Sequence, residues 1–180
     1  DNLTNLIGFN FRMTELTAAI CNSQLTKLQD IVAERIHYAE RLSLAFTGLD
    51  GIQPPKVRDG CNHVYYVWPA RFNAEKVGIS RNAFATALAA EGVPVNQGYV
   101  KPQHLLPIFQ RRLALGANGF PFNLTTERYD PASCPACRQL HYEEELGFGI
   151  CNFALSENTI DKIISAFHKV YDHRHELCDS

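Results

Sequence analysis

Hydrophobic residues recur at helical spacing near the start of the chain and again near its end. From residue 25 onward an apolar side chain follows every three or four positions, namely Leu25, Leu28, Val32, Ile36, Ala39, Leu42 and Phe46. This period predicts one helical region over residues 13–46, ended by Gly48 and unbroken unless residues 21–24 bend it. Toward the end of the chain, Ser156 is a suitable N-cap for a helix that buries Ile160, Ile163, Ile164, Phe167, Val170 and Tyr171.

The segments between these helical regions are shorter. Residues 48–62 are rich in Gly, Pro and Asp and predict a loop, whereas the aromatic residues 63–72 predict a strand in which Pro69 forces an edge or an end. We then expect a Ser80-capped helix over 81–91, an extended segment or strand over 93–100 and a Pro-bounded turn with a short helix over 101–112. An irregular segment over 114–133, a helix over 134–145 and a short strand over 148–153 should follow. Few strands separated by helices predict a two-layer α/β domain.

Composition and charge narrow the class of protein. The chain has 180 residues, of which 46% are hydrophobic and 20% charged, as in an ordinary globular domain. Its net charge of -2 and the absence of a basic run argue against nucleic acid as a partner. The sequence contains neither an apolar stretch of about 18 residues, as a membrane span needs, nor a signal-peptide pattern, so we expect a cytoplasmic protein without a membrane partner.

The predicted first helix is long for a chain of this size. Unbroken, it would measure about 50 Å, whereas a compact domain of this length has a radius of gyration of about 16 Å. Helices of this kind usually join domains or subunits. The chain also opens at Asp1 and has Met13 as its single methionine. We therefore expect it to be part of a longer protein.

The stretch GFNFRMTELTAAI, residues 8–20, places one polar side chain, Asn10, between two aromatic residues just before a predicted helix. A helix N-terminus offers unpaired N–H groups and the positive end of the macrodipole. Asn10 adds an amide and Arg12 adds a full charge, which together are the parts of an anion site. The alternative is that Asn10 is the N-cap of the helix, because Asn is among the preferred capping residues.

Two further groups of residues suggest chemistry. Cys134 and Cys137 have the C-x-x-C spacing of a redox pair, and His141 would add a third metal ligand; a proline at the first position of a helix explains the same stretch without either. His104 lies in a Pro-rich turn with Tyr99, Lys101 and Gln103, a set of donors suited to a polar, phosphorylated or sugar-like ligand unless the turn is simply exposed. The three glutamates at 143–145 are most simply a solvated face.

Several of these stretches together resemble the sugar aminotransferases of the DegT/StrS type. Residues 8–20 resemble the family's Gly-aromatic-Asn-aromatic-Arg-x-x-Glu-x-x-Ala-Ala segment almost position for position. Residues 63–72 resemble its His-x-Tyr strand, and residues 92–109, GVPVNQGYVKPQHLLPIF, resemble the segment that ends in a Pro-x-His-x-x-Pro-aromatic turn. The stretch CPACRQL and the last helix fall where the family has its closing helices. The likeness covers nearly the whole chain.

The resemblance implies a fold-type I aminotransferase that uses pyridoxal 5'-phosphate (PLP) and works as a homodimer. Residues 1–48 would be the N-terminal motif and the long interdomain helix, and residues 49–180 the small C-terminal α/β domain; the large PLP-binding domain would be absent from this chain. The implied substrate is a nucleotide-linked keto sugar, in sugar or cell-surface polysaccharide biosynthesis. Glutamate or glutamine would be the amino donor.

The resemblance also assigns roles to residues. Asn10, with Arg12 beside it, would reach the PLP phosphate of the neighbouring subunit, and Tyr99, Lys101 and His104 would line the sugar-nucleotide pocket. The Schiff-base lysine lies before the first motif in the family, so we expect no catalytic residue, no metal site and no activity in this chain alone. Two other hypotheses stay open at this point: a stand-alone binding module that dimerises through the long helix, and a thiol-redox or zinc protein that uses Cys134 and Cys137.

Overall fold

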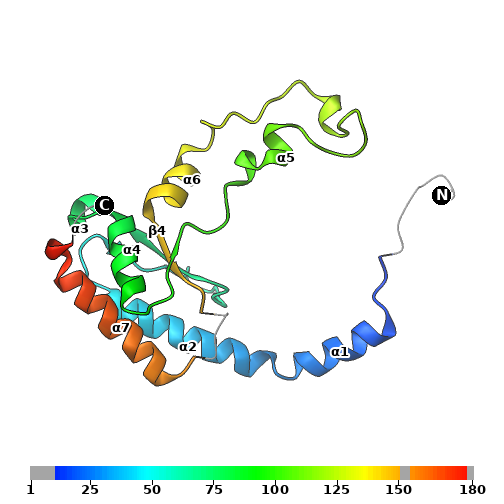
Figure 1. The fold of residues 1–180 in the computed structure, drawn as a ribbon. Coiled ribbons are helices and arrows are strands. Elements are labelled where there is room, and N and C mark those ends of the chain that lie inside the picture. The colour runs from blue at the N-terminus through cyan, green and yellow to red at the C-terminus, as the bar shows by residue number, and fades with distance from the viewer. Residues whose placement is uncertain (1–10, 151–154, 178–180) are drawn as a thin grey trace. The chain divides into compact units, whose positions relative to one another are not determined.

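The computed structural model describes residues 11–150 and 155–177. The chain divides into two compact units, Asp1–Glu34 and Arg35–Ser180. The first unit contains helix α1 (Glu15–Leu25) and the beginning of helix α2 (Leu28–Phe46). The remainder of α2 and all later elements belong to the second unit (Figure 1).

The helical region predicted over residues 13–46 is two helices, α1 and α2, which a turn at residues 26–27 separates. The Thr26 hydroxyl donates a hydrogen bond to the carbonyl of Ser23, an alternative to regular helix pairing for this part of the backbone. The break therefore follows residues 21–24 instead of falling within them. At the other end, the side chain of Thr14 accepts the N–H of Thr17 and is the N-cap of α1. The interpretation of Asn10 as this N-cap is wrong, since the helix begins at Glu15.

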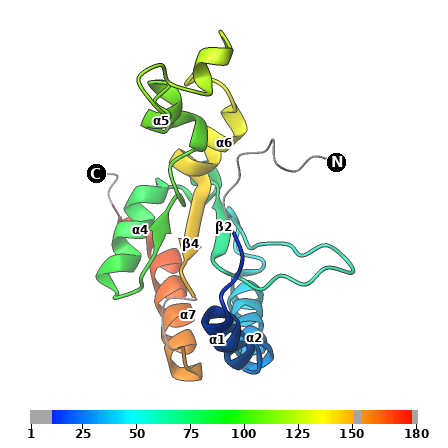
Figure 2. The ribbon, with the colours of Figure 1, turned by 90° about the vertical axis from the view of Figure 1, so that its right-hand side faces the viewer.

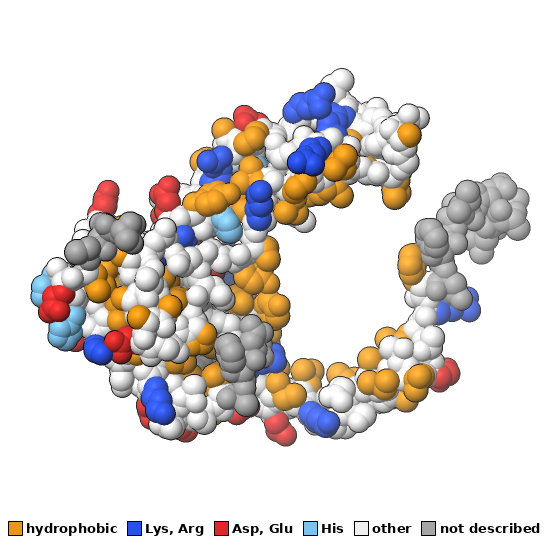
Figure 3. Space-filling view, in the orientation of Figure 1, with side chains coloured by type: hydrophobic (Ala, Val, Ile, Leu, Met, Phe, Trp, Pro, Cys, Tyr) orange, Lys and Arg blue, Asp and Glu red, His pale blue; other side chains and the backbone are white. Residues whose placement is uncertain are grey.

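Helix α1 buries none of its residues. Its large apolar side chains, and those just before it, are exposed; they are Phe11, Met13, Leu16, Ile20 and Leu25 (Figure 3). The predicted stripe on α2 is divided in the same respect, because Leu28 is exposed whereas Ala39, Leu42 and Phe46 are buried. The apolar stripe is thus covered along the second half of α2 and exposed along its first part.

The second unit is built on an antiparallel sheet, which confirms the predicted α/β class. In the described residues its strand order is β1-β2-β4-β3. The strands are β1 (Ile52–Gln53), β2 (Trp68–Phe72), β3 (Asn96–Gln97) and β4 (Glu145–Phe148). The long pairing is between β2 and β4, in which Trp68 lies opposite Phe148 and Ala70 opposite Leu146.

Helices α2, α4 (Arg81–Ala90) and α7 (Glu157–Asp172) contribute the other side of the hydrophobic core, and α4 and α7 lie side by side (Figure 1). Ser80 and Ser156 cap α4 and α7 through their side-chain oxygens, as predicted from the sequence. The predicted apolar face of α7 is also confirmed: Ile160, Ile163, Phe167, Val170 and Tyr171 are buried and Ile164 is partly buried.

Phe46 is the centre of an aromatic cluster between the helices and the sheet. Its ring stacks on Phe167 of α7 with 4.0 Å between ring centroids, and it meets Trp68 of β2 edge to face at 5.6 Å. The indole N–H of Trp68 donates a hydrogen bond to Ser43 of α2, so burial leaves this polar atom paired. These contacts fix the sheet against α2 and α7.

Along β2 and β4, residues that face the core alternate with residues that face the other side of the sheet. There Pro69 lies opposite Gly147, and Arg71 lies opposite Glu145. Pro69 is tolerated in β2, although β2 has a neighbour on both sides, because β1 pairs only with Phe72 and Arg71 and ends before it. The long loop after β1 extends away from α4 and α7 (Figure 2).

Two predicted elements differ in their bounds. The strand expected over residues 63–72 begins only at Trp68, because Tyr65 has a φ of 46° that interrupts an extended backbone. The strand expected over 148–153 is β4, which ends at Phe148; residues 151–154 lie outside the described residues. The helix expected over 134–145 is two short pieces, α6 (Pro135–Gln139) and a π-helical turn, η4 (Leu140–Glu144).

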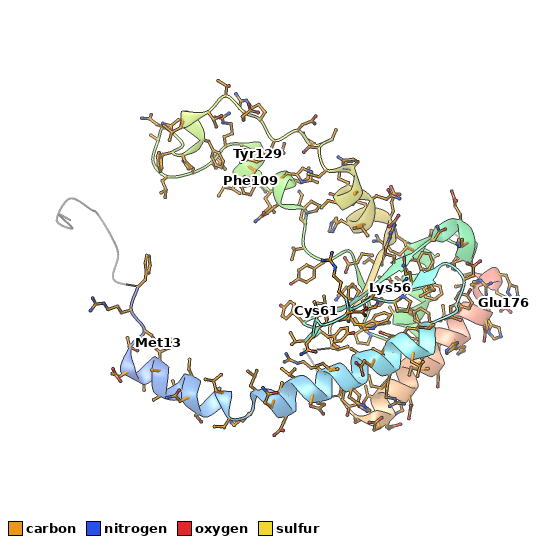
Figure 4. All side chains as sticks on the ribbon, turned by 180° about the vertical axis from the view of Figure 1, so that it is seen from behind. Met13, Lys56, Cys61, Phe109, Tyr129 and Glu176 are labelled. Atoms are coloured by element: carbon orange, nitrogen blue, oxygen red, sulfur yellow. The ribbon has the colours of Figure 1, made fainter. Side chains whose placement is uncertain are left out.

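Residues 103–130, here called the outer segment, are ordered by their own contacts. They contain η2 (Gln103–Leu105), α5 (Pro107–Gln110) and η3 (Phe122–Leu124), which confirms the predicted short helix. Phe109 packs against Tyr129 with 5.0 Å between ring centroids (Figure 4), and both contact Phe122. Arg112 donates hydrogen bonds to the carbonyls of Phe122, Thr125 and Glu127. The remaining short helices of the unit are α3 (Ala74–Val77) and η5 (Arg174–Glu176).

Candidate functional site

A cleft of about 600 Å³ lies against the face of the sheet that bears Pro69 and Arg71. This volume is within the range of pockets that hold small molecules and cofactors. Its apolar lining includes Pro54, Pro55, Pro69, Val100, Pro102 and Leu140. Lys56 of the loop after β1 also lines it (Figure 4). The cleft therefore combines flat apolar walls with polar side chains at separate points.

Buried Arg81 holds the π-helical turn that forms one wall of the cleft. Its Nη1 donates to the carbonyls of His141 and Glu145, at 3.0 Å each, and its Nη2 donates to the carbonyl of Tyr142 at 2.7 Å. Burial lowers the pKa of the Arg81 guanidinium below its ordinary value, an effect that nearby Glu145 and Glu143 oppose. Arg81 therefore satisfies two carbonyls of the π-helical turn and one at the start of β4.

Gly98 fixes the same turn from the side of β3. Its N–H donates to the carbonyl of Glu145 at 3.1 Å. A Cβ atom at this position would lie 2.5 Å from the carbonyl oxygen of His141 and 2.8 Å from its Nδ1, so a side chain would displace His141. With a φ of 75°, the backbone also favours glycine here. His141 is thereby held at the cleft between Gly98 and the carbonyl contacts of Arg81.

The charged side chains at the cleft differ in their pairing. Arg71 donates from Nε to a carboxylate oxygen of Glu144 at 2.8 Å and forms an ion pair with the same oxygen through Nη2 at 2.7 Å. The expectation of a solvated glutamate face is therefore wrong for Glu144. Lys56 and His141 also line the cleft, and neither has an ion-pair partner among the described residues.

Glu145, which is half-buried, lies at the start of β4 and also lines the cleft. Burial raises the pKa of its carboxyl above the ordinary value, and the charge of Arg81 and the backbone N–H of Tyr99 offset part of this effect. Between the ordinary and the raised pKa the folded state keeps a proton that the unfolded state has released. The free energy of unfolding therefore falls as the pH rises through this interval.

We expect Glu145→Gln to remove this pH dependence, because glutamine is similar in shape and does not titrate. The difference in melting temperature, variant minus wild type, should increase between pH 4 and pH 7. Thermal melts of both proteins across this range measure it. A difference that is constant or decreases with pH would contradict the assigned direction of the pKa change.

The structure brings only part of the predicted substrate set together. Tyr99 lines the cleft, whereas Lys101 is exposed and does not. His104 is half-buried in η2, and its Nε2 is buried without a hydrogen-bond partner among the described residues. Sequence reasoning missed Lys56 and considered His141 only as a metal ligand. No local signal marks either residue, since their position depends on contacts with distant segments.

The predicted cofactor residues belong to the first unit. Arg12 is exposed just before α1. Asn10 lies outside the described residues. Their assignment to the PLP phosphate stays a prediction.

The thiol-redox and zinc hypothesis finds no support in the geometry. Cys134 and Cys137 are exposed free thiols, and only Cys137 lines the cleft. Over residues 11–150 and 155–177, no group of three or more His, Cys, Asp or Glu side chains is placed to hold a metal ion. Pro135 is at the start of α6, as predicted by the alternative in which this stretch is simply a helix that begins with a proline.

A PLP site requires a lysine, a carboxylate for the pyridine nitrogen and a cradle for the phosphate in one pocket. Lys76 and Lys169 form surface ion pairs with Asp50 and Glu91. Lys56 lines the cleft together with Glu145. The contacts of these three lysines assign none of them to PLP.

The model of the DegT/DnrJ/EryC1/StrS aminotransferase family matches residues 1–139, which is more than three quarters of the chain. The chain belongs to this family. Aminotransferases of the DegT/DnrJ/EryC1/StrS family are PLP-dependent. The match includes the motif of residues 8–20 and the segment with Tyr99, Lys101 and His104.

Curated relatives of this DegT-family chain are longer than the chain itself. The spore coat polysaccharide biosynthesis protein SpsC of Bacillus subtilis is 28% identical over 114 residues, which cover 63% of this chain and 29% of SpsC. An uncharacterized protein of Methanocaldococcus jannaschii is 24% identical over 114 residues, with the same shares. The match thus spans 29% of the length of either relative.

A solved structure supports the fold of the DegT-family chain. The likeness to S. venezuelae DesV, crystallised in complex with a ketimine intermediate, has a TM-score of 0.69 at 19% identity and covers 93% of this chain and 39% of DesV. This likeness confirms the predicted fold of a fold-type I aminotransferase. No helix in the described part of the chain is both long and apolar enough to cross a membrane.

Proposed function

We propose that this chain is the C-terminal part of a PLP-dependent aminotransferase that aminates a nucleotide-linked keto sugar. The amino donor is glutamate or glutamine, and the complete enzyme acts in the cytoplasm as a homodimer, in sugar or surface-polysaccharide biosynthesis. The observation that carries this proposal is the family match over residues 1–139. The role of SpsC in spore coat polysaccharide biosynthesis supports the sugar pathway.

In this proposal residues 1–48 are the motif and interdomain helix, and residues 49–180 are the small domain. The large PLP-binding domain, with the lysine that binds PLP, lies elsewhere in the complete protein. The exposed apolar side chains of α1 support this arrangement, because surfaces of this kind usually pack against other protein. PLP supplies the electron sink for the reaction when it is bound.

The residues of this chain bind and orient. Asn10 donates its amide to the PLP phosphate of the neighbouring subunit, with the charge of Arg12 nearby. Tyr99, Lys101 and His104 contact the sugar-nucleotide substrate. The unpaired Nε2 of His104 supports its role, since a buried ring nitrogen without a partner costs free energy that a ligand hydroxyl or phosphate would recover.

The test is a transamination assay of the complete protein. Purified enzyme with PLP is given glutamate or glutamine and a panel of nucleotide-linked keto sugars, and the aminated sugar is detected by mass spectrometry. We expect one donor and a subset of the sugars to react. The absence of an aminated product from every sugar would overturn the proposal.

The variant His104→Ala should raise the KM for the sugar more than the KM for the amino donor.

A second candidate function is a stand-alone dimerising module, which the exposed apolar side chains of α1 also favour.

In either case we expect the isolated chain to self-associate, since Leu16 and Ile20 of α1 are exposed. Sedimentation should show a dimer or a larger species that Leu16→Glu and Ile20→Glu shift toward monomer. The control Leu44→Glu changes an equally exposed leucine of α2 and should leave the mass unchanged. A monomeric wild type at high concentration would contradict this prediction, and activity of the complete protein separates the two functions.

A further inference from the structure

Cys134 and Cys137 are a pair of reactive side chains that the proposed function does not use. In the described part of the chain no third ligand is placed to complete a metal site with them. A reversible thiol modification, however, requires only two exposed thiols that can meet, and both side chains are exposed free thiols. They lie at the start of α6, which continues through η4 into β4 (Figure 1).

The first turn of α6 holds the two cysteines at a spacing that suits a disulfide. Cys134 is the N-cap, and its carbonyl accepts the N–H of Arg138 at 3.1 Å, so one helical turn closes across the pair. Cα atoms three residues apart in an α-helix are about 5 Å from each other, and disulfides join Cα atoms about 4.4–6.8 Å apart. Arg138 also donates a hydrogen bond to the carbonyl of Pro131, which ties the preceding loop to this turn. The fold therefore keeps the two thiols within reach of each other.

The thiol of Cys134 is not engaged in capping its helix. The hydroxyls of Ser80 and Ser156, the N-caps of α4 and α7, accept the N–H groups of Ala83 and Thr159. Cys134 forms no such side-chain hydrogen bond with α6, because sulfur is a weak acceptor. Formation of a disulfide at Cys134 therefore costs no capping interaction.

Cys137 connects this turn to the cleft. Its side chain lines the cleft together with Leu140 and His141. The N–H of Leu140 donates to the carbonyls of Ala136 and Cys137, so the wall of the cleft continues directly from the turn that carries the thiols. A cross-link between the two cysteines restricts this turn and makes the adjoining wall open less often.

We propose that Cys134 and Cys137 are a reversible redox modification site, at which a low-molecular-weight disulfide such as glutathione disulfide forms an intramolecular disulfide. The thiolate of one cysteine attacks a sulfur of glutathione disulfide, which breaks that S–S bond and releases one glutathione. The second cysteine then attacks the mixed disulfide and releases the other glutathione. Two protein thiols are oxidised, one disulfide is reduced to two thiols, and the protons of the cysteines end on the released glutathione.

A disulfide of this kind suits the cytoplasm, where cysteines are kept reduced and disulfides are usually transient and redox-sensing. Because this chain carries both thiols, the site does not depend on the proposed function.

In the first test, the 180-residue chain is equilibrated with mixtures of glutathione and glutathione disulfide, alkylated, digested with trypsin and analysed by mass spectrometry. Residues 129–138, YDPASCPACR, form one tryptic peptide that contains both cysteines. We expect this peptide to lose two hydrogen atoms as the proportion of glutathione disulfide rises, and to regain them with dithiothreitol. The intramolecular disulfide should exceed the mixed disulfide with glutathione about tenfold or more, because the second thiol is held at a high effective concentration.

Two variants identify the pair. In Cys134→Ser, Cys137 should keep glutathione as a mixed disulfide, because the thiol that displaces it is absent. Cys61→Ser, which removes an exposed cysteine from the loop after β1, should form the Cys134–Cys137 disulfide like the wild type. A wild-type peptide that keeps two free thiols in every mixture, or that accumulates the mixed disulfide instead, would overturn the site.

The second test measures amide hydrogen exchange of residues 138–144 in the reduced and the oxidised chain. Oxidation should slow this exchange roughly threefold or more, because the cross-linked turn opens less often. Glutathione disulfide should have no such effect on the double variant Cys134→Ser with Cys137→Ser. A disulfide that forms without slowing exchange in these residues would overturn the link to the cleft. Neither test uses transamination, so a complete protein that fails to transaminate overturns the proposed function and leaves both results as they are.

Discussion

Replacing Asn10 by alanine in the complete enzyme is expected to weaken PLP binding by about ten- to a hundredfold. An amide hydrogen bond to a charged phosphate is worth about 1.5–3 kcal/mol, and its loss changes affinity by that factor. The fold should be unaffected, because Thr14 and not Asn10 caps α1. The measurements are the equilibrium dissociation constant for PLP and the melting temperature of the PLP-free enzyme.

Thr14→Ala is the matched control for this prediction. It removes the hydrogen bond to the N–H of Thr17 and should lower the free energy of unfolding by about 1 kcal/mol. PLP affinity should be nearly unchanged. Asn10→Ala is thus expected to change PLP affinity alone, and Thr14→Ala to change stability alone. An Asn10→Ala enzyme that loses stability and keeps its PLP affinity would show that Asn10 has a structural role.

The second large effect is expected from Phe46→Ala, which should lower the free energy of unfolding by roughly 3–5 kcal/mol. Phe46 is fully buried, stacks on Phe167 and contacts Trp68, so its removal leaves a cavity between α2, α7 and the sheet. Urea denaturation monitored by the fluorescence of Trp68, the only tryptophan of the chain, measures the loss.

Leu44→Ala is the control for the core variant. Leu44 is on the same helix two residues earlier, but its side chain is 78% exposed. Its replacement should change the free energy of unfolding by less than about 0.5 kcal/mol. Similar losses in the two variants would mean that α2 does not pack as described.

Features that depend on neighbouring residues were predictable from the sequence. Ser80 and Ser156 cap their helices because the capping oxygen and the N–H it accepts are three residues apart. The buried face of α7 follows from its period, since an amphipathic helix on a sheet buries one side. The α/β class follows from the same local patterns.

Features that depend on distant contacts were not predictable. The strand at residues 63–72 is shorter than its composition suggests, because Tyr65 adopts a positive φ that no propensity indicates. The first half of the apolar stripe has the same period as the second, yet Leu28 is exposed and Leu42 is buried. The helical period of apolar residues identifies the face that is suited to burial, but it does not show which segment covers that face.

The cleft shows the same limit for function. Its position follows from the pairing of β2 with β4, and His141 is fixed by Arg81, sixty residues earlier in the chain. Lys56 reaches it from the loop after β1. No motif links these residues. By contrast, Asn10, Tyr99, Lys101 and His104 were singled out from their local sequence, and the roles that the family resemblance gives them stay predictions.

We propose that this DegT-family chain contributes binding residues to an enzyme whose PLP-binding lysine lies outside it. The most direct measurement is the half-reaction of glutamate with PLP, followed as pyridoxamine phosphate, with the isolated chain and with the complete protein. We expect the complete protein to form pyridoxamine phosphate and the chain to match a free-lysine control. Turnover by the chain above that control, with PLP located by borohydride reduction on one of its own lysines, would contradict the account.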